Sequence, residues 1–161
     1  MIITNYRLIA PILLGLCLLA PSACAPTSTV AGSEAQIPPM TSGMARVWFL
    51  RDRDPQEQHG TPVIYANGQP IGRSQSGAAF FRDVSPGNYA FTVQSYDIPT
   101  GQKVALQLAA GTQTYLDIQW GASWQQGVAG GETFYVQMLS PELGPAYLRS
   151  LRYLGPGGAV S

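Results

Sequence analysis

Residues 78–93 of the chain read AAFFRDVSPGNYAFTV, and this stretch decides the fold. Two runs, residues 78–82 and 88–96, flank Ser85-Pro86-Gly87, and the second run alternates large apolar side chains with small or polar ones. Alternation of period two is typical of a half-buried strand. Proline presets φ at the second position of a turn, and glycine supplies the positive φ that a type II turn needs at the third. The stretch therefore predicts two strands joined by a tight type II turn.

The same strand-and-turn pattern extends in both directions from this stretch. Residues 46–51 are β-branched and aromatic, with a charge at each end, and predict a first strand with most of its side chains covered. Residues 62–65 and 69–72 flank Asn67-Gly68, a dipeptide typical of the two-residue type I′ hairpin turn. Further strands are expected at residues 103–108, 112–119 and 133–139.

Seven or eight strands joined by Gly and Pro turns, with no helix between them, predict an all-β protein with a single antiparallel β-sandwich. We place the sandwich at residues 44–140. Pro145 favours a helix start and Gly155-Pro156 a stop, so residues 141–155 are expected to form a short helix packed on the sandwich. Residues 156–161 are expected to be a disordered tail.

The first residues of the chain predict export. Arg7 precedes an apolar block at residues 8–20, and Pro21-Ser22-Ala23-Cys24 follows, which is the order of a signal peptide at residues 1–23. Thirteen helical residues rise only about 20 Å, short of a hydrocarbon core of about 30 Å. A cysteine directly after small residues resembles the lipobox of bacterial lipoproteins, in which that cysteine is acylated. Because Pro21 stands where leucine is usual, ordinary secretion with cleavage near Ala23 or Ala25 remains the alternative.

Residues 24–43 are predicted to be a flexible linker, because they are rich in Ala, Pro, Thr, Ser and Gly and contain no aromatic residue. Such a chain has a mean end-to-end distance of about 25 Å. The alternative is a segment draped over the domain with Ile37 and Met40 docked. Cys17 would leave with the signal peptide, so the mature chain cannot form an internal disulfide and depends on its hydrophobic core.

Composition and spacing argue against several kinds of chemistry. A net charge of zero and a charged fraction of 11% predict no nucleic-acid partner. His59 is the only histidine, so we predict no catalytic residue, no metal site and no cofactor. Asp52, Asp54 and Glu57 alternate with Arg51 and Arg53, which indicates self-neutralised surface charge rather than a calcium loop.

Two sets of residues keep other functions open. A pair of carboxylates for glycoside hydrolysis could come from Asp83, Asp97, Asp117 and Glu132, although nothing in their spacing favours it. Trp120 and Trp124 lie in a glycine-rich stretch and form our candidate contact surface, since exposed tryptophans often meet a partner. The alternative is that Trp120 closes the end of the core and Trp124 is half covered.

The strand ARVWF at residues 45–49, the Asn67-Gly68 hairpin and the stretch at residues 79–93 carry a resemblance. Together they resemble a family of small uncharacterised bacterial envelope lipoproteins and, more loosely, prealbumin-like or carboxypeptidase-regulatory-like β-sandwiches. The resemblance covers roughly residues 45–120. It implies a domain that binds or spaces, and it assigns no catalytic residue.

We therefore expect a non-catalytic cell-envelope lipoprotein, held to the membrane by an N-terminal lipid anchor on Cys24 with palmitate among its acyl chains. Ala25 rather than Asp beside Cys24 resembles lipoproteins sent to the outer membrane, which places the domain in the periplasm. There it would act as a tethered binding or assembly module, with other envelope proteins as partners. The alternatives are an accessory lipoprotein of a secretion system and an envelope enzyme acting on cell-wall polysaccharide.

Overall fold

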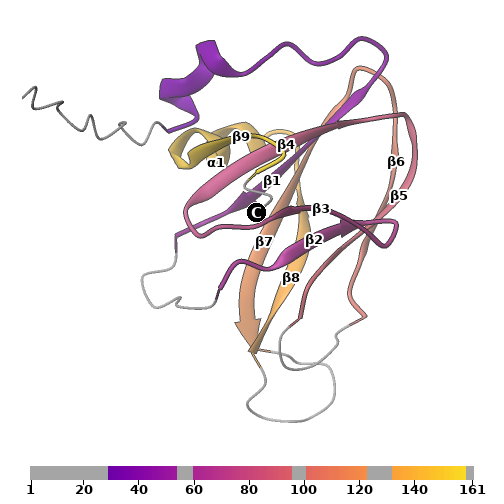
Figure 1. Ribbon diagram of the computed structural model, residues 1–161, viewed down its shortest axis with the longest axis vertical. Helices are drawn as coiled ribbons and strands as arrows, with labels where there is room; N and C mark the ends of the chain where they lie inside the picture. The colour runs from indigo at the N-terminus through magenta and orange to yellow at the C-terminus, as the bar shows by residue number, and fades with distance from the viewer. Residues whose placement is uncertain (1–28, 54–59, 96–100, 123–131, 159–161) are drawn as a thin grey trace, which may run out of the picture.

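The computed structural model describes residues 29–53, 60–95, 101–122 and 132–158, and these form a two-sheet sandwich (Figure 1). The strands in this part of the chain are β1 (Ala45–Arg51), β2 (Val63–Ala66), β3 (Gln69–Arg73), β4 (Ala78–Val84), β5 (Gly87–Val93), β6 (Val104–Leu108), β7 (Gln113–Ala122), β8 (Glu132–Leu139) and β9 (Arg152–Pro156). A 3-10 helix, η1 (Ala31–Gln36), precedes β1, and a short helix, α1 (Gly144–Ser150), lies between β8 and β9. The predicted all-β sandwich is confirmed.

The strand order differs from that of a purely antiparallel sandwich. One sheet has the order β8-β7-β1-β4-β9 and the other β3-β2-β5-β6. Two pairs in the larger sheet, β1 with β7 and β4 with β9, are parallel. Each pair joins strands that are far apart in the chain, and a period-two pattern says nothing about which distant strand becomes a neighbour or in which direction it runs. The sequence therefore indicated the strands but not their parallel pairing.

The two predicted turns have different outcomes. Asn67 and Gly68 have φ values of +50° and +79°, positive at both positions as a type I′ turn requires. The Asn67 side chain also accepts a hydrogen bond from the Ala90 N–H at 2.8 Å, which ties this hairpin to β5. Gly87 has a φ of +153°, far from the roughly +80° of a type II turn. It is already the first residue of β5, opposite Leu108, so the predicted type II turn is wrong.

The main core lies between the two sheets. Phe49 on β1 is at its centre, stacked on Phe80 with 5.0 Å between ring centroids and edge-on to Phe91 at 5.7 Å. The other buried residues of this core are Ala45, Val47, Ile64, Ala66, Leu108, Leu116, Ile118, Phe134 and Val136. These residues come from both sheets, so the packing between the layers is the main apolar burial of the domain.

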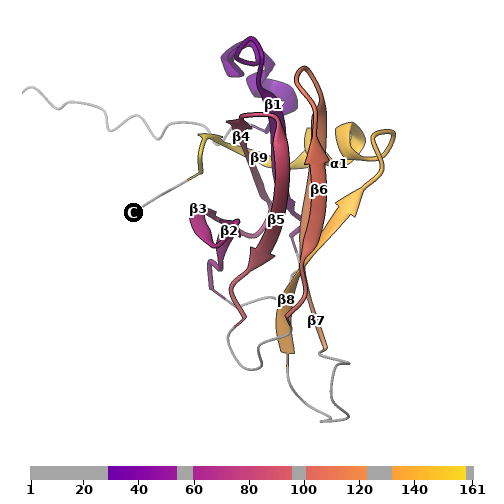
Figure 2. The same cartoon turned by 90° about the vertical axis from the view of Figure 1, so that its right-hand side faces the viewer.

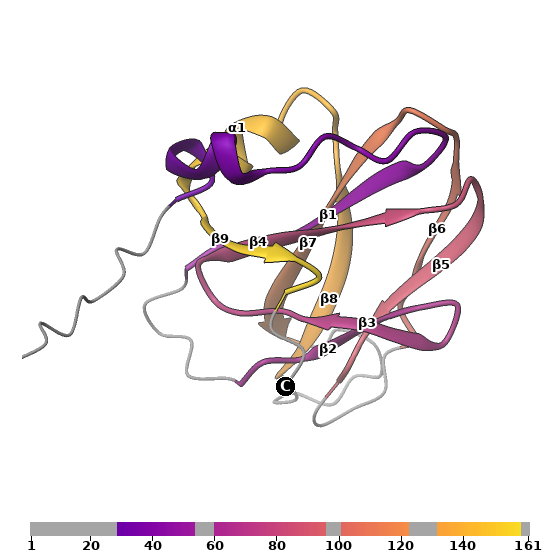
Figure 3. The ribbon, with the colours of Figure 1, turned by 45° about the horizontal axis from the view of Figure 1, so that its top comes forward.

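A second apolar cluster covers the other face of the five-stranded sheet. It contains Val30, Trp48, Leu50, Ala79, Phe81, Tyr115, Leu148 and Leu151. η1 and α1 lie side by side over this face (Figure 3) and both lie near the top of the view in Figure 2. Because β1 is buried on both faces, with all seven of its residues covered, the sheet needs this outer cover as well as the inner core.

Residues 29–41, which we call the N-terminal strap, correct the predicted flexible linker. Val30 is 3% exposed, and its N–H donates to the Leu151 carbonyl at 2.7 Å. Thr29 forms a β-bridge with Arg152, and Ile37 packs against the outer cluster. The strap docks because the apolar outer face of the sheet buries the few apolar side chains of this otherwise polar segment. The alternative with Ile37 and Met40 docked is confirmed for Ile37, whereas Met40 is half-buried and is not part of the outer cluster. Residues 24–28 lie outside the described part.

The C-terminal region also differs from the prediction. α1 ends at Ser150, because Leu151 is extended, with φ −88° and ψ 151°. The residues expected to continue the helix form β9, which uses the backbone groups that β4 presents at its edge. Gly157, predicted to belong to the disordered tail, donates its N–H to the Phe81 carbonyl at 2.9 Å. Residues 159–161 lie outside the described part.

Candidate functional site

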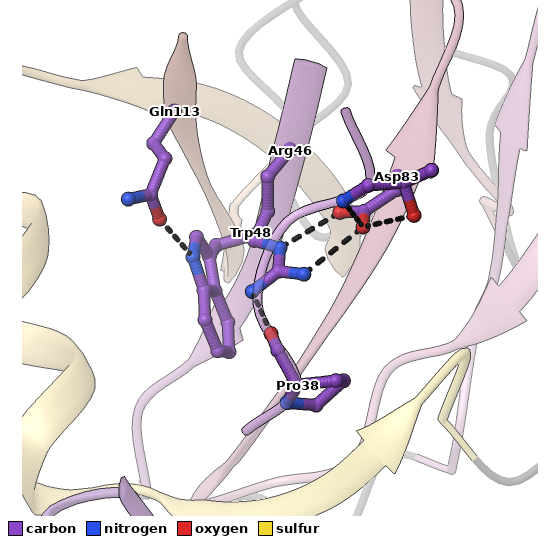
Figure 4. A network of polar contacts seen from close by, with 6 residues as sticks. Pro38, Arg46, Trp48, Asp83 and Gln113 are labelled. Atoms are coloured by element: carbon purple, nitrogen blue, oxygen red, sulfur yellow. Dashed lines mark hydrogen bonds and ion pairs between the residues drawn. The ribbon is translucent and has the colours of Figure 1, made fainter. Parts of the chain in front are cut away.

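A buried ion pair on the outer face connects the strap to the sheet (Figure 4). Arg46 on β1 lies opposite Asp83 on β4, and the two side chains are only 5% and 14% exposed. The Arg46 Nε donates to Oδ1 of Asp83 at 2.7 Å and Nη2 donates to Oδ2 at 2.9 Å. This two-point geometry is the strong form of an arginine–carboxylate pair.

The other hydrogen bonds of this ion pair hold the strap. Arg46 Nη1 donates to the Pro38 carbonyl at 2.9 Å, and the N–H of Thr41 donates to Asp83 Oδ2 at 3.0 Å. The guanidinium carbon also lies 3.8 Å from the centre of the Phe81 ring. The hydrogen bond from Arg46 is the largest cause that holds the pKa of Asp83 below its usual range. The pair neutralises itself and fixes the strap, so it is a structural device rather than a reactive centre.

Asp117 on β7 is the other described carboxylate of the predicted enzyme set. It is 5% exposed and accepts a hydrogen bond from Gln119 Nε2 at 2.8 Å. Burial is the main cause that raises the pKa of Asp117, and the nearby negative charge of Asp52 adds to the effect. A buried carboxyl with a raised pKa is often functional. Whether Asp117 can act in a glycosidase pair then depends on its distance from Asp83.

The Cα atoms of Asp83 and Asp117 are spaced more widely than the carboxyl groups of a glycosidase pair, and Arg46 holds the Asp83 carboxylate in place. Asp83 lies opposite Arg46 and Asp117 opposite Leu50, so they flank β1 from opposite sides and are offset by four residues. At about 3.3 Å per residue and about 4.8 Å per strand, their Cα atoms are roughly 16 Å apart. Catalytic carboxyl groups of glycoside hydrolases lie about 5 to 9.5 Å apart. Asp97 and the Glu132 side chain lie outside the described part.

The stability of the Asp117→Asn variant is expected to depend on pH in a way that reports this burial. Because the folded-state pKa of Asp117 is raised above 3.8, the wild type loses stability as pH rises through that pKa. Asparagine cannot ionise and still accepts from Gln119, so Asp117→Asn should be more stable at pH 7 by on the order of 1 kcal/mol. The gain should vanish below pH 3.8. Urea unfolding at pH 3 and pH 7 measures this.

Asp52→Asn is the matched control for that experiment, because it removes only the neighbouring charge. Its gain at pH 7 should be smaller than that of Asp117→Asn, since Asp52 is a lesser cause of the shift than burial. A pH-independent difference between Asp117→Asn and wild type would contradict the assignment.

The predicted contact residues have separate outcomes. Trp120 is half-buried on β7 and packs edge-on against Phe134 with 4.7 Å between ring centroids, as part of the main core. This is the alternative in which Trp120 closes the end of the core. Trp124 lies outside the described residues, so its role as a contact residue stays a prediction. Because Trp120 is only half-buried, its role as a contact residue also stays a prediction.

The charged stretch after β1 is only partly described. Arg51 is buried at the end of β1, where its Nη1 donates to the Gly60 carbonyl at 3.2 Å and the guanidinium faces the Phe134 ring at 4.5 Å. The predicted surface charge is thus wrong for Arg51, because the strand carries this side chain inward. Asp54, Glu57 and His59 lie outside the described residues. Within the described ranges, no group of three or more His, Cys, Asp or Glu residues is placed to hold a metal ion.

A pocket of about 450 Å³, with both polar and apolar atoms in its lining, lies where the strap meets the sheet. Its lining residues come from the strap, the ends of β1 and α1, and the starts of β4 and β9: Thr29, Asp52, Arg53, Gly77, Ser150, Leu151 and Arg152. The Arg152 N–H donates to the Gly77 carbonyl at 3.0 Å, and its Nη2 donates to Gln75 Oε1 at 2.7 Å. Sequence reasoning missed this pocket, because four separate segments assemble it and no motif marks any of them.

These features define a two-sheet β-sandwich protein with a docked N-terminal strap. The model of the family described as "Protein of unknown function (DUF2846)" matches residues 41–138, more than half of the chain, so the protein belongs to this family. No curated protein and no solved structure matches the chain. The match supports neither the lipoprotein nor the prealbumin-like resemblance, and both stay predictions.

None of the helices in the described ranges has the length and apolar character needed to span a membrane.

Proposed function

We propose that the protein is a non-catalytic lipoprotein of the bacterial cell envelope, anchored through acylated Cys24 to the outer membrane and facing the periplasm. Its β-sandwich would act there as a binding or assembly module for other envelope proteins. The observation that carries this proposal is the order of residues 7–24, in which a basic residue, an apolar block and small residues lead to the cysteine.

The docked strap supports a short tether. Thr29 pairs with Arg152 and lies only five positions after Cys24, with four residues between them. Five extended residues span at most about 17 Å, which would hold the sandwich near the headgroups rather than about 25 Å away. A fixed, close attachment suits a module that presents one face to a partner in the same membrane.

The described carboxylates favour a binding role over the enzyme alternative. Asp83 is bound by Arg46, and Asp117 is buried roughly 16 Å away by strand geometry, so the two lack the spacing for acid–base work on a sugar. The accessory-lipoprotein alternative remains a special case of the same proposal, because a secretion system would be one such partner.

Cys24→Ala should abolish membrane attachment. The variant cannot be acylated. It therefore lacks the acyl chains, two or more of which give stable membrane attachment. We expect the wild type in the detergent-soluble membrane fraction and Cys24→Ala in the soluble periplasmic or secreted fraction, as measured by fractionation and immunoblotting.

Cys17→Ala is the matched control, because Cys17 lies in the apolar block that the signal peptidase would remove. This variant should label with a palmitate analogue like the wild type, while Cys24→Ala should not label. Equal membrane recovery of Cys24→Ala and wild type, or palmitate labelling lost only in Cys17→Ala, would contradict the proposal.

A further inference from the structure

We propose that the pocket beside Thr29 binds the phosphodiester of a phospholipid headgroup in the membrane that anchors the chain. This inference rests on the proposed function, since it needs Cys24 to be acylated. It goes further by assigning a ligand class to a site that neither the family match nor the sequence indicates.

The side chains of the pocket suit a phosphate. Arg53 follows β1, and Arg152 begins β9, so two arginine residues from different segments line the same pocket of about 450 Å³. Arginine presents a planar set of donors that matches phosphate oxygens. The Gln75 side chain accepts from Arg152 Nη2 at 2.7 Å, which orients that guanidinium. Thr29 and Ser150 also line the pocket. The Ser150 hydroxyl donates to the Tyr147 carbonyl at 3.0 Å, whereas Thr29 Oγ1 accepts from the Gly32 N–H at 3.3 Å and keeps its own hydrogen to donate.

The net charge of the pocket bears on which kind of phosphate group it binds. Two arginines and Asp52 give the lining a formal charge of one positive unit. This charge balances the single negative charge of a phosphodiester, whereas a phosphomonoester carries about 1.5 to 2 negative charges at neutral pH. Asp52 would repel the second charge of the monoester. The position of Thr29 close to the proposed anchor, rather than the charge alone, points to the diester of a phospholipid headgroup over free phosphate.

The tether brings such headgroups to the pocket. Thr29 is part of the pocket wall, and the chain between it and Cys24 spans at most about 17 Å. A site held this close to a membrane surface meets its ligand at an effective concentration in the millimolar range. Weak intrinsic affinity is then enough for occupancy, which fits a shallow pocket that few side chains line.

The test uses the acylated full-length protein, purified from membranes in an uncharged detergent, with its N-terminal mass measured first. Dihexanoyl phosphatidylglycerol is then titrated while the melting temperature is followed. A ligand at ten times its dissociation constant should raise the melting temperature by about 3 to 5 °C. Arg53→Gln should reduce that rise at least threefold, because Arg53 is exposed and its loss leaves the fold intact.

Arg149→Gln is the matched control, since Arg149 is exposed on α1 beside Ser150 but does not line the pocket. It should respond like the wild type. An equal rise in all three proteins would overturn the proposal, as would an equal rise with dihexanoylglycerol, which lacks the phosphate, or with inorganic phosphate. An N-terminus without acyl chains would instead overturn the proposed function, and the separate mass measurement distinguishes the two failures.

Discussion

Arg46→Ala is expected to lower the free energy of unfolding by about 3 kcal/mol at pH 7. The substitution leaves the Asp83 carboxylate at 14% exposure without its two-point partner and frees the Pro38 carbonyl from its hydrogen bond. A loss of this size is a large share of the 5 to 15 kcal/mol that stabilises a typical domain. Urea unfolding followed by tryptophan fluorescence measures it.

The effect of Arg46→Ala should shrink in acid. The pKa of Asp83 is lowered from 3.8 in the folded state, so the stability that the pair contributes is fully present above pH 3.8 and is lost as pH falls toward the folded-state pKa. The double variant Arg46→Met with Asp83→Leu serves as the control, because it removes both charges and should recover much of the loss. A loss below about 1 kcal/mol in Arg46→Ala at pH 7 would mean that the pair behaves as an exposed one.

Trp48→Ala should cost about 3 to 5 kcal/mol of unfolding free energy. Trp48 is 3% exposed on the outer face, edge-on to Phe81 with 4.9 Å between ring centroids, and its Nε1 donates to Gln113 Oε1 at 3.0 Å. Truncation would leave a cavity beneath α1 and the strap and an acceptor without its donor. Thermal and urea unfolding measure the loss.

Trp120→Ala and Gln113→Ala separate the contributions to that loss. Trp120 is half-buried, so its truncation should cost less than that of Trp48. Gln113→Ala removes only the hydrogen bond to Trp48 and should cost about 1 kcal/mol. If Trp48→Ala lost no more than Gln113→Ala, the outer cluster would not be a second core.

Local patterns allowed β1 to β8 and one turn to be predicted, but not β9, whose residues were expected to be helical. Asn67-Gly68 specified its hairpin because few other residues accept positive φ at both positions, and the alternation in residues 88–93 specified a half-buried strand. The type II turn at Gly87 failed because the strand pairing with Leu108 sets the conformation of that glycine. Local sequence therefore predicts a conformation reliably only where tertiary contacts do not compete with it.

The outer face was the main feature that sequence reasoning missed. Residues 46–51 predicted a strand with most side chains covered, and a strand covered on both faces requires an outer layer that some other segment must supply. Val30, Ile37 and Leu151 are that layer, but single apolar residues in polar segments carry no period. The residues of β1 thus indicate that an outer layer exists. Which segments form that layer depends on long-range packing. The pocket beside Thr29 depends on the same packing.

The docked strap changes what the proposed anchor does. A flexible linker would let the sandwich turn freely above the membrane, whereas a strap tied to Arg46, Asp83 and Leu151 fixes the point at which the chain enters the domain. If Cys24 carries lipid, that point and the pocket next to it face the headgroups. The orientation of the domain would then be part of the proposed role as a binding or assembly module.

The mass of the mature N-terminal peptide, from protein purified out of membranes, tests the proposed function most directly. The account predicts a peptide that begins at Cys24 and carries a diacylglyceryl group and an amide-linked acyl chain. A mature chain that begins after Cys24, or one that begins at Cys24 without acyl groups, would contradict it.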